Sequence, residues 1–202
     1  MKFKDFYNIK GKIITKMWLN QFAFSLFGLF VASPFSANMS IFAGIFALLF
    51  YMFVVGYAIL DDAQKDKISY DAGRAECLSA FTGFKYAIFA FIPSYIIFAI
   101  NTVLSYITDV SNTSLAFIIK LITKYALAGQ IVGIDAGLTR YTYDAVNQIR
   151  TSTAPDYILN LSEHSWFQII FLIFVNFAFG LIYYLGFKGI ISVNTTLTNQ
   201  KK

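Results

Sequence analysis

Four charged residues of one polar segment are the first candidates for chemistry. Asp61, Asp62, Asp71 and Arg74 lie between two long apolar runs. Carboxylates grouped at a membrane surface can hold a divalent cation that bridges phosphates. These residues therefore suggest an enzyme acting on a lipid-linked or phosphorylated substrate. The alternative is that the charges only keep a connecting loop in water and set the orientation of the chain.

The motifs of known enzyme classes are incomplete or missing. The CDP-alcohol phosphotransferase pattern, Asp-x-x-Asp-Gly-x-x-Ala-Arg followed by spaced aspartates, is only echoed by residues 70–74 (YDAGR). The order is broken and the later aspartates are missing, so we reject that family. The chain also has no HExxH motif and no glycine-rich phosphate loop. Intramembrane proteolysis and nucleotide hydrolysis lose support accordingly.

A second candidate site combines Lys120, Lys124 and Asp135, which interrupt an apolar stretch. At about 100° per residue these three side chains share one face of a helix. Ionisable groups at membrane depth are costly, by roughly 2.5–3.5 kcal/mol each, and often mark an ion pathway or a lipid headgroup site. The alternative is that both lysines extend their flexible side chains to a nearby interface.

The single histidine and the single cysteine give no metal or redox site. His164 stands without the further histidines, cysteines or carboxylates that a metal needs, so a helix-capping role suits it better. Cys77 can form no disulfide within the chain, and an isolated thiol of this kind usually serves as a small apolar side chain. We therefore expect no catalytic residue, no metal and no cofactor.

These residues must be positioned by elements that suit a bilayer. Of 202 residues, 57% are hydrophobic and only 13% are charged, whereas a soluble domain carries about a quarter charged residues. The apolar residues occur in blocks, and 23 Phe and 13 Tyr are more apolar surface than a small soluble core can hide. An uncharged run of twenty residues, 41–60, has the length of one membrane-spanning helix.

The sequence predicts an all-α, polytopic integral membrane protein. Four clear spans are expected at 17–33, 41–60, 84–106 and 166–187, with residues 61–83 as a loop between the second and third. An amphipathic helix at 115–138 is expected to span as well, although it could instead lie along the interface. Residues 1–16 form a basic cytoplasmic segment, 17–190 a single membrane domain, and 191–202 a disordered tail. Trp18 and the pair Tyr183–Tyr184 suit the interfacial aromatic belt.

Charge placement predicts the orientation. With the N-terminus inside, the loops at 34–40 and 107–114 face outward and contain no Lys or Arg, while residues 61–85 face inward with four. Five N-terminal lysines are expected to meet anionic lipid headgroups rather than nucleic acid, because a hydrophobic run follows them directly. They are Lys2, Lys4, Lys10, Lys12 and Lys16. The side of the C-terminus depends on whether 115–138 crosses, and the charges leave this open.

Four segments carry a resemblance: 16–28 (KMWLNQFAFSLFG), 65–74 (KDKISYDAGR), 83–93, and 183–188 (YYLGFK). With them the chain resembles a family of small, uncharacterised multi-spanning membrane proteins from Gram-positive bacteria. The resemblance implies a bacterial plasma membrane and several spans, and it implies no activity. Residues 115–138 match it poorly.

The expected role is that of a non-enzymatic multi-pass protein of the plasma membrane, a transport-related component or an accessory subunit. Its partners would be the lipid bilayer and other membrane subunits or copies of itself. Two alternatives stay open. One is the membrane-embedded enzyme at the acidic segment 61–76, and the other is an immunity-type protein that binds another membrane factor.

Overall fold

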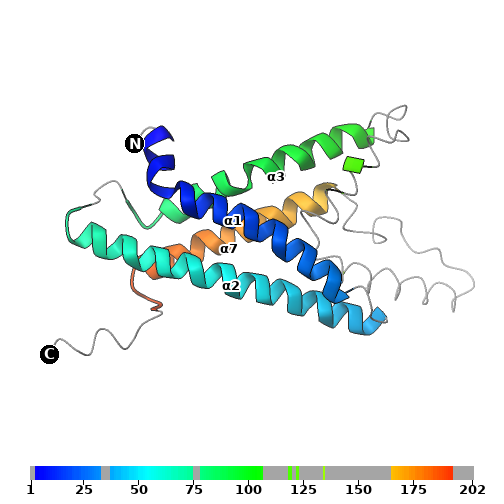
Figure 1. Cartoon of the computed structure of the whole chain (residues 1–202), viewed down its shortest axis with the longest axis horizontal. Helices are drawn as coiled ribbons and strands as arrows, with labels where there is room; N and C mark the ends of the chain where they lie inside the picture. Colours follow the sequence, from blue (N-terminus) through cyan, green and yellow to red (C-terminus); the bar gives the residue numbers. More distant parts are fainter. Residues whose placement is uncertain are drawn as a thin grey trace, which may run out of the picture. The chain divides into compact units, whose positions relative to one another are not determined.

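Four long helices form the described part of the chain. The computed structural model describes residues 3–32, 37–74, 78–106 and 165–192, together with 118, 119, 122 and 134. The helices are α1 (Phe3–Ala32), α2 (Ala37–Asp71), α3 (Thr82–Tyr106) and α7 (Ser165–Phe187), as Figure 1 shows in chain order. Each is long and apolar enough to cross a bilayer. The predicted all-α polytopic membrane fold is confirmed.

The surfaces of these helices are suited to hydrocarbon. Large apolar side chains are widely exposed, among them Phe30 at 74%, Phe53 at 70% and Phe42 at 68%. In water such surfaces would drive aggregation, whereas in a bilayer they contact lipid tails at no cost. The chain is therefore a membrane protein whose helices keep apolar faces outward.

Two helices extend further than the sequence analysis expected. α1 begins at Phe3, so it includes most of the basic N-terminal segment, and the part able to span runs from Phe6 to Val31. α2 continues through the charged residues as far as Asp71, whereas residues 61–83 had been expected to form a loop. α3 and α7 nearly coincide with the spans predicted at 84–106 and 166–187.

Glycine caps explain where α2 and α7 end. Gly73 has a φ of 67°, and the amide of Arg74 donates to the carbonyl of Ser69 at 2.9 Å. Gly189 has a φ of 74°, and the amide of Ile190 donates to the carbonyl of Leu185 at 2.9 Å. Both are Schellman motifs, in which glycine supplies the left-handed conformation that stops a helix. The Asp-Ala-Gly-Arg sequence at 71–74 thus closes α2.

The described residues belong to two compact units, and each helix contributes to both. Unit 1 comprises residues 1–18, 52–91 and 173–202, and unit 2 comprises 19–51 and 92–172. Unit 1 therefore gathers the beginnings of α1 and α3 and the ends of α2 and α7. The acidic segment lies in unit 1.

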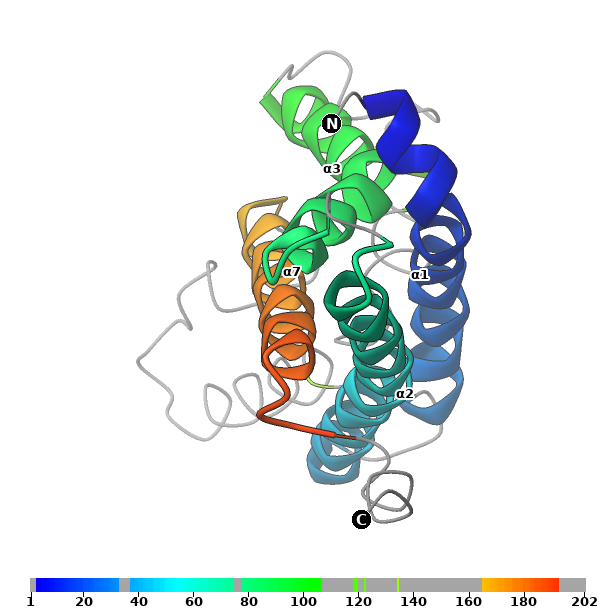
Figure 2. The same cartoon turned by 90° about the vertical axis from the view of Figure 1, so that its left-hand side faces the viewer.

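Within unit 1, glycines let α7 approach α2 and α3 closely (Figure 2). A Cβ added to Gly186 would lie 2.6 Å from Leu60 Cδ1, and a Cβ added to Gly180 would overlap the ring of Phe84. Small residues at helix contacts are the usual means of tight packing in membranes, where burial from water gives no driving force. This packing brings the last two turns of α7 against the charged end of α2.

Two predicted segments lie mostly outside the described residues. They are the amphipathic helix at 115–138, of which only residues 118, 119, 122 and 134 are described, and the tail from residue 193 to 202.

Candidate functional site

A buried lysine is the centre of the site. Lys10 lies on the same face of α1 as Phe6, Ile14 and Met17, and all four are buried. The side chain of Lys10 is only 4% exposed. A lysine so deeply placed needs compensating charge, since burying an unpaired ammonium costs several kcal/mol.

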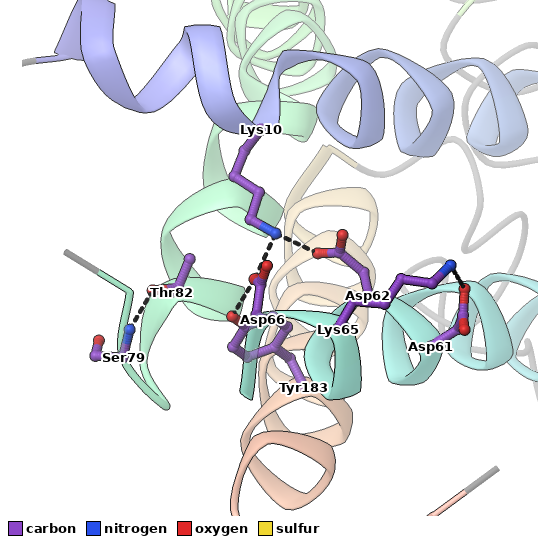
Figure 3. A network of polar contacts seen from close by, with 8 residues as sticks. All are labelled: Lys10, Asp61, Asp62, Lys65, Asp66, Ser79, Thr82 and Tyr183. Atoms are coloured by element: carbon purple, nitrogen blue, oxygen red, sulfur yellow. Dashed lines mark hydrogen bonds and ion pairs between the residues drawn. The ribbon is translucent and has the colours of Figure 1, made fainter. Parts of the chain in front are cut away.

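The compensation comes from two aspartates of α2. Lys10 Nζ lies 2.7 Å from Asp62 Oδ2, and it forms a second ion pair with Asp66 Oδ2, as Figure 3 shows. Asp62 and Asp66 stand four residues apart and therefore project from the same face of the helix. One ammonium group thus holds two carboxylates.

A tyrosine from α7 completes the network. The hydroxyl of Tyr183 donates a hydrogen bond to Asp66 Oδ2 at 2.6 Å (Figure 3). Gly83, near the start of α3, makes room for the Tyr183 ring, because a Cβ at that position would overlap it. We call Lys10, Asp62, Asp66 and Tyr183 the Lys10 cluster.

A second tyrosine borders the cluster. The ring of Tyr86 on α3 meets the ring of Tyr183 edge to face, with centroids 5.4 Å apart and planes at 86°. Tyr86 is fully buried, and its hydroxyl has no hydrogen-bond partner among the described residues. Asp62 and Asp66 lie close enough to act electrostatically on this phenol. All four helices therefore contribute a polar side chain to one region of unit 1.

The four residues predicted at the acidic segment do not form one site. Asp62 belongs to the Lys10 cluster, but Asp61 pairs with Lys65 at 2.5 Å, in a contact with both side chains well exposed. Asp71 and Arg74 are exposed at the end of α2, and no ion pair joins them to another described residue. The structure thus divides the predicted acidic surface among three places.

The other predicted site cannot be placed. Lys120, Lys124 and Asp135 all lie outside the described residues. So does His164, which the sequence analysis set aside as a capping residue.

Sequence reasoning missed Lys10, Asp66 and Tyr183. Lys10 was grouped with four other lysines as a headgroup contact, although its spacing from Phe6 and Ile14 matches a buried helix face. The four-residue spacing of Asp62 and Asp66 was a second available signal. Tyr183 was expected in the interfacial belt, yet it is fully buried in the structure.

The cluster joins one ammonium group, two carboxylates and a phenol hydroxyl. With both carboxylates ionised and Lys10 charged, the cluster carries one excess negative charge. No group of three or more potential metal ligands occurs among the residues that the structure describes.

Unit 2 contains a separate buried polar contact. The hydroxyl of Tyr51 donates to Gln21 Oε1, and both side chains are fully buried. Aromatic rings surround this contact, with Phe24 packing against Tyr51 at 5.6 Å between centroids. Gln21, a polar residue that the first span carries into the bilayer, thus has a partner, as hydrocarbon requires.

Comparisons of the chain with protein families, with curated proteins and with solved structures found no match.

Proposed function

We propose that this chain is a non-enzymatic, multi-pass protein of a bacterial plasma membrane that takes part in ion-coupled transport. The observation that carries the proposal is the Lys10 cluster, in which a buried lysine pairs with one buried and one half-buried aspartate on helices able to span a membrane. Such groups are costly in a membrane and commonly mark ion pathways or proton relays.

The arrangement of the aspartates also argues against the enzyme alternative. An enzyme binding phosphate through a divalent cation needs several carboxylates with free oxygens directed at one point. Here Asp61 and Asp62 pair with different lysines, and Asp71 lies at the capped end of α2. The charges of this segment are therefore better suited to pairing helices and binding a proton than to binding a metal–phosphate complex.

The proposed membrane and orientation rest on the sequence. The resemblance to Gram-positive membrane proteins favours a bacterial plasma membrane, and the lysine-rich N-terminus with its arginine- and lysine-free loops favours a cytoplasmic N-terminus. In that orientation the Lys10 cluster lies toward the cytoplasmic end of the spans. An ion could then exchange between the cluster and the cytoplasm.

Ion flux through reconstituted protein tests the proposal. Purified chain is placed in liposomes that contain a pH-sensitive dye, a valinomycin-driven potassium potential is imposed, and a parallel batch contains a sodium-sensitive dye. We expect one dye to respond faster than in protein-free liposomes. Lys10→Met should abolish the response, whereas Lys12→Met, at an exposed position of the same helix, should retain it. Absence of flux with both dyes would contradict a transport role.

A further inference from the structure

The Lys10 cluster is unbalanced in charge. One ammonium group faces two carboxylates, and Lys65, a second lysine that acts on Asp62, is already paired with Asp61. In the described part of the chain, the titratable groups that face the carboxylates are Lys10 on α1, Lys65 on α2, Tyr86 on α3 and Tyr183 on α7. The lysines are needed for the existing pairs and the tyrosines carry no positive charge. An excess negative charge in a buried site is costly, and binding a proton removes it.

The two carboxylates are not equivalent. Asp66 accepts from both Lys10 and Tyr183, and its side chain is 11% exposed. Asp62 accepts from Lys10 alone in this network, and its side chain is 24% exposed. Hydrogen bonds to a carboxylate favour its charged form. Asp62 is therefore the easier carboxylate to protonate and also the one that solvent can reach more readily.

Tyr86 provides an independent indication that the site binds something more. Its buried hydroxyl lacks a partner in the described part of the chain and lies beside Tyr183 and the two carboxylates. Leaving a buried hydroxyl without a hydrogen-bond partner is destabilising. A protonated Asp62 would offer both a donor and an acceptor in this region, which a pair of carboxylates locked on Lys10 does not.

We propose that Asp62 binds one exchangeable proton, while Asp66 keeps its contacts with Lys10 and Tyr183. Protonation forms an O–H bond on Asp62, changes the charge of the cluster from −1 to zero, and weakens the hold of Lys10 on Asp62. The beginning of α1 is thereby released from one of the two ion pairs that join Lys10 to α2. This inference rests on the proposed function only in naming the proton as the coupling ion.

Infrared titration of the full chain in lipid nanodiscs tests the site. The signal is the C=O stretch of a protonated carboxyl group, followed as the pH is changed. In wild-type protein we expect one such group to titrate above the range of exposed carboxyls. Asp62→Asn should remove it, and Asp71→Asn, which makes the same change at an exposed position, should leave it in place.

Two further variants fix the direction of the effect. Lys10→Met removes the nearby cation, so the midpoint should rise by roughly 1–3 pH units. Asp66→Asn leaves one carboxylate for one lysine, so the midpoint should fall by about one unit or more. Helix content by circular dichroism and elution from a sizing column show whether each variant is folded. Any variant that fails these checks is replaced by the milder Tyr183→Phe, which should raise the midpoint slightly.

The outcomes separate this inference from the proposed function. A band that survives in Asp62→Asn, or that does not move in Lys10→Met, would overturn the proton site. Loss of the band on adding sodium at constant pH would assign the site to sodium and overturn it as well. Because the titration needs no gradient, a normal titration combined with absent liposome flux would refute transport while leaving the proton site standing.

Discussion

The hydroxyl of Tyr183 and the carboxylate of Asp66 lie 2.6 Å apart although 117 residues separate them in the chain. This hydrogen bond joins the end of α7 to the end of α2. Lys10, near the beginning of α1, forms an ion pair with the same aspartate. Asp66 is therefore the residue through which three helices of unit 1 meet. Its two bonds depend on groups that can be removed one at a time.

Replacing Tyr183 by Phe removes only the hydroxyl group that donates a hydrogen bond to Asp66. A hydrogen bond to a charged group contributes about 1.5–3 kcal/mol, so the melting temperature in detergent should fall clearly. Tyr184→Phe is the matched control, since Tyr184 is its neighbour and is only half-buried. Equal losses in the two variants would contradict a specific role for the Tyr183 hydroxyl.

Replacing Lys10 by Met leaves two partly buried carboxylates without their cation. Removing one partner of a buried ion pair typically costs about 3–5 kcal/mol, whereas loss of an exposed lysine costs at most about 1 kcal/mol. We therefore expect the melting temperature of Lys10→Met to be far below that of Lys12→Met. Restoring neutrality with Asp62→Asn and Asp66→Asn in the Lys10→Met background should recover much of the loss. An unchanged melting temperature in Lys10→Met would contradict this prediction and show that water solvates the two carboxylates instead.

The spans could be predicted because hydrocarbon imposes a simple requirement on sequence. Uncharged runs such as 41–60 must be helical and about twenty residues long, so their existence follows from composition alone. The ends of the helices were harder to predict. Asp61 to Asp71 contains six charged residues and was expected to form a loop, yet α2 continues to the glycine cap at Gly73. The cap was the available signal, because a glycine just beyond polar helix-forming residues is a usual stop.

The Lys10 cluster could be predicted only in part. The spacing of Asp62 and Asp66 puts them on one helix face, and Lys10 continues a buried apolar stripe, so each half of the site is visible in the sequence. Their pairing is not, because it depends on how α1 and α2 pack, and any of five N-terminal lysines could have supplied the charge. The burial of Tyr183 depends similarly on Gly83, which lies 100 residues earlier in the chain.

The substitution Gly180→Ala tests how closely α7 packs on α3. Alanine is the better helix former by about 1 kcal/mol, but its Cβ would overlap the ring of Phe84, and overpacking costs about 1–3 kcal/mol. The net effect of Gly180→Ala should be a loss of thermal stability. At Gly56 a Cβ would meet only the terminal Cδ1 of Ile182, at 3.0 Å, so Gly56→Ala should be nearly neutral. A stabilising Gly180→Ala would contradict this packing.

The sides on which the two termini lie follow from the contacts of unit 1. Tyr183 near the end of α7 bonds Asp66, which in turn binds Lys10 near the beginning of α1. Gln64 also donates to the carbonyl of Ile191, just beyond α7. We therefore predict that the beginning of α1 and the end of α7 face the same side of the bilayer.

Reporter fusions measure this directly. If the N-terminus is cytoplasmic, green fluorescent protein fused after Lys202 should fluoresce, and alkaline phosphatase at the same position should be inactive. A phosphatase fusion between α1 and α2, at residues 33–36, is the internal control and should be active, because a single span precedes it. An active phosphatase after Lys202, with the control also active, would place the termini on opposite sides. A single crossing by 115–138 would then be required, and the bond between Tyr183 and Asp66 could not exist in the membrane.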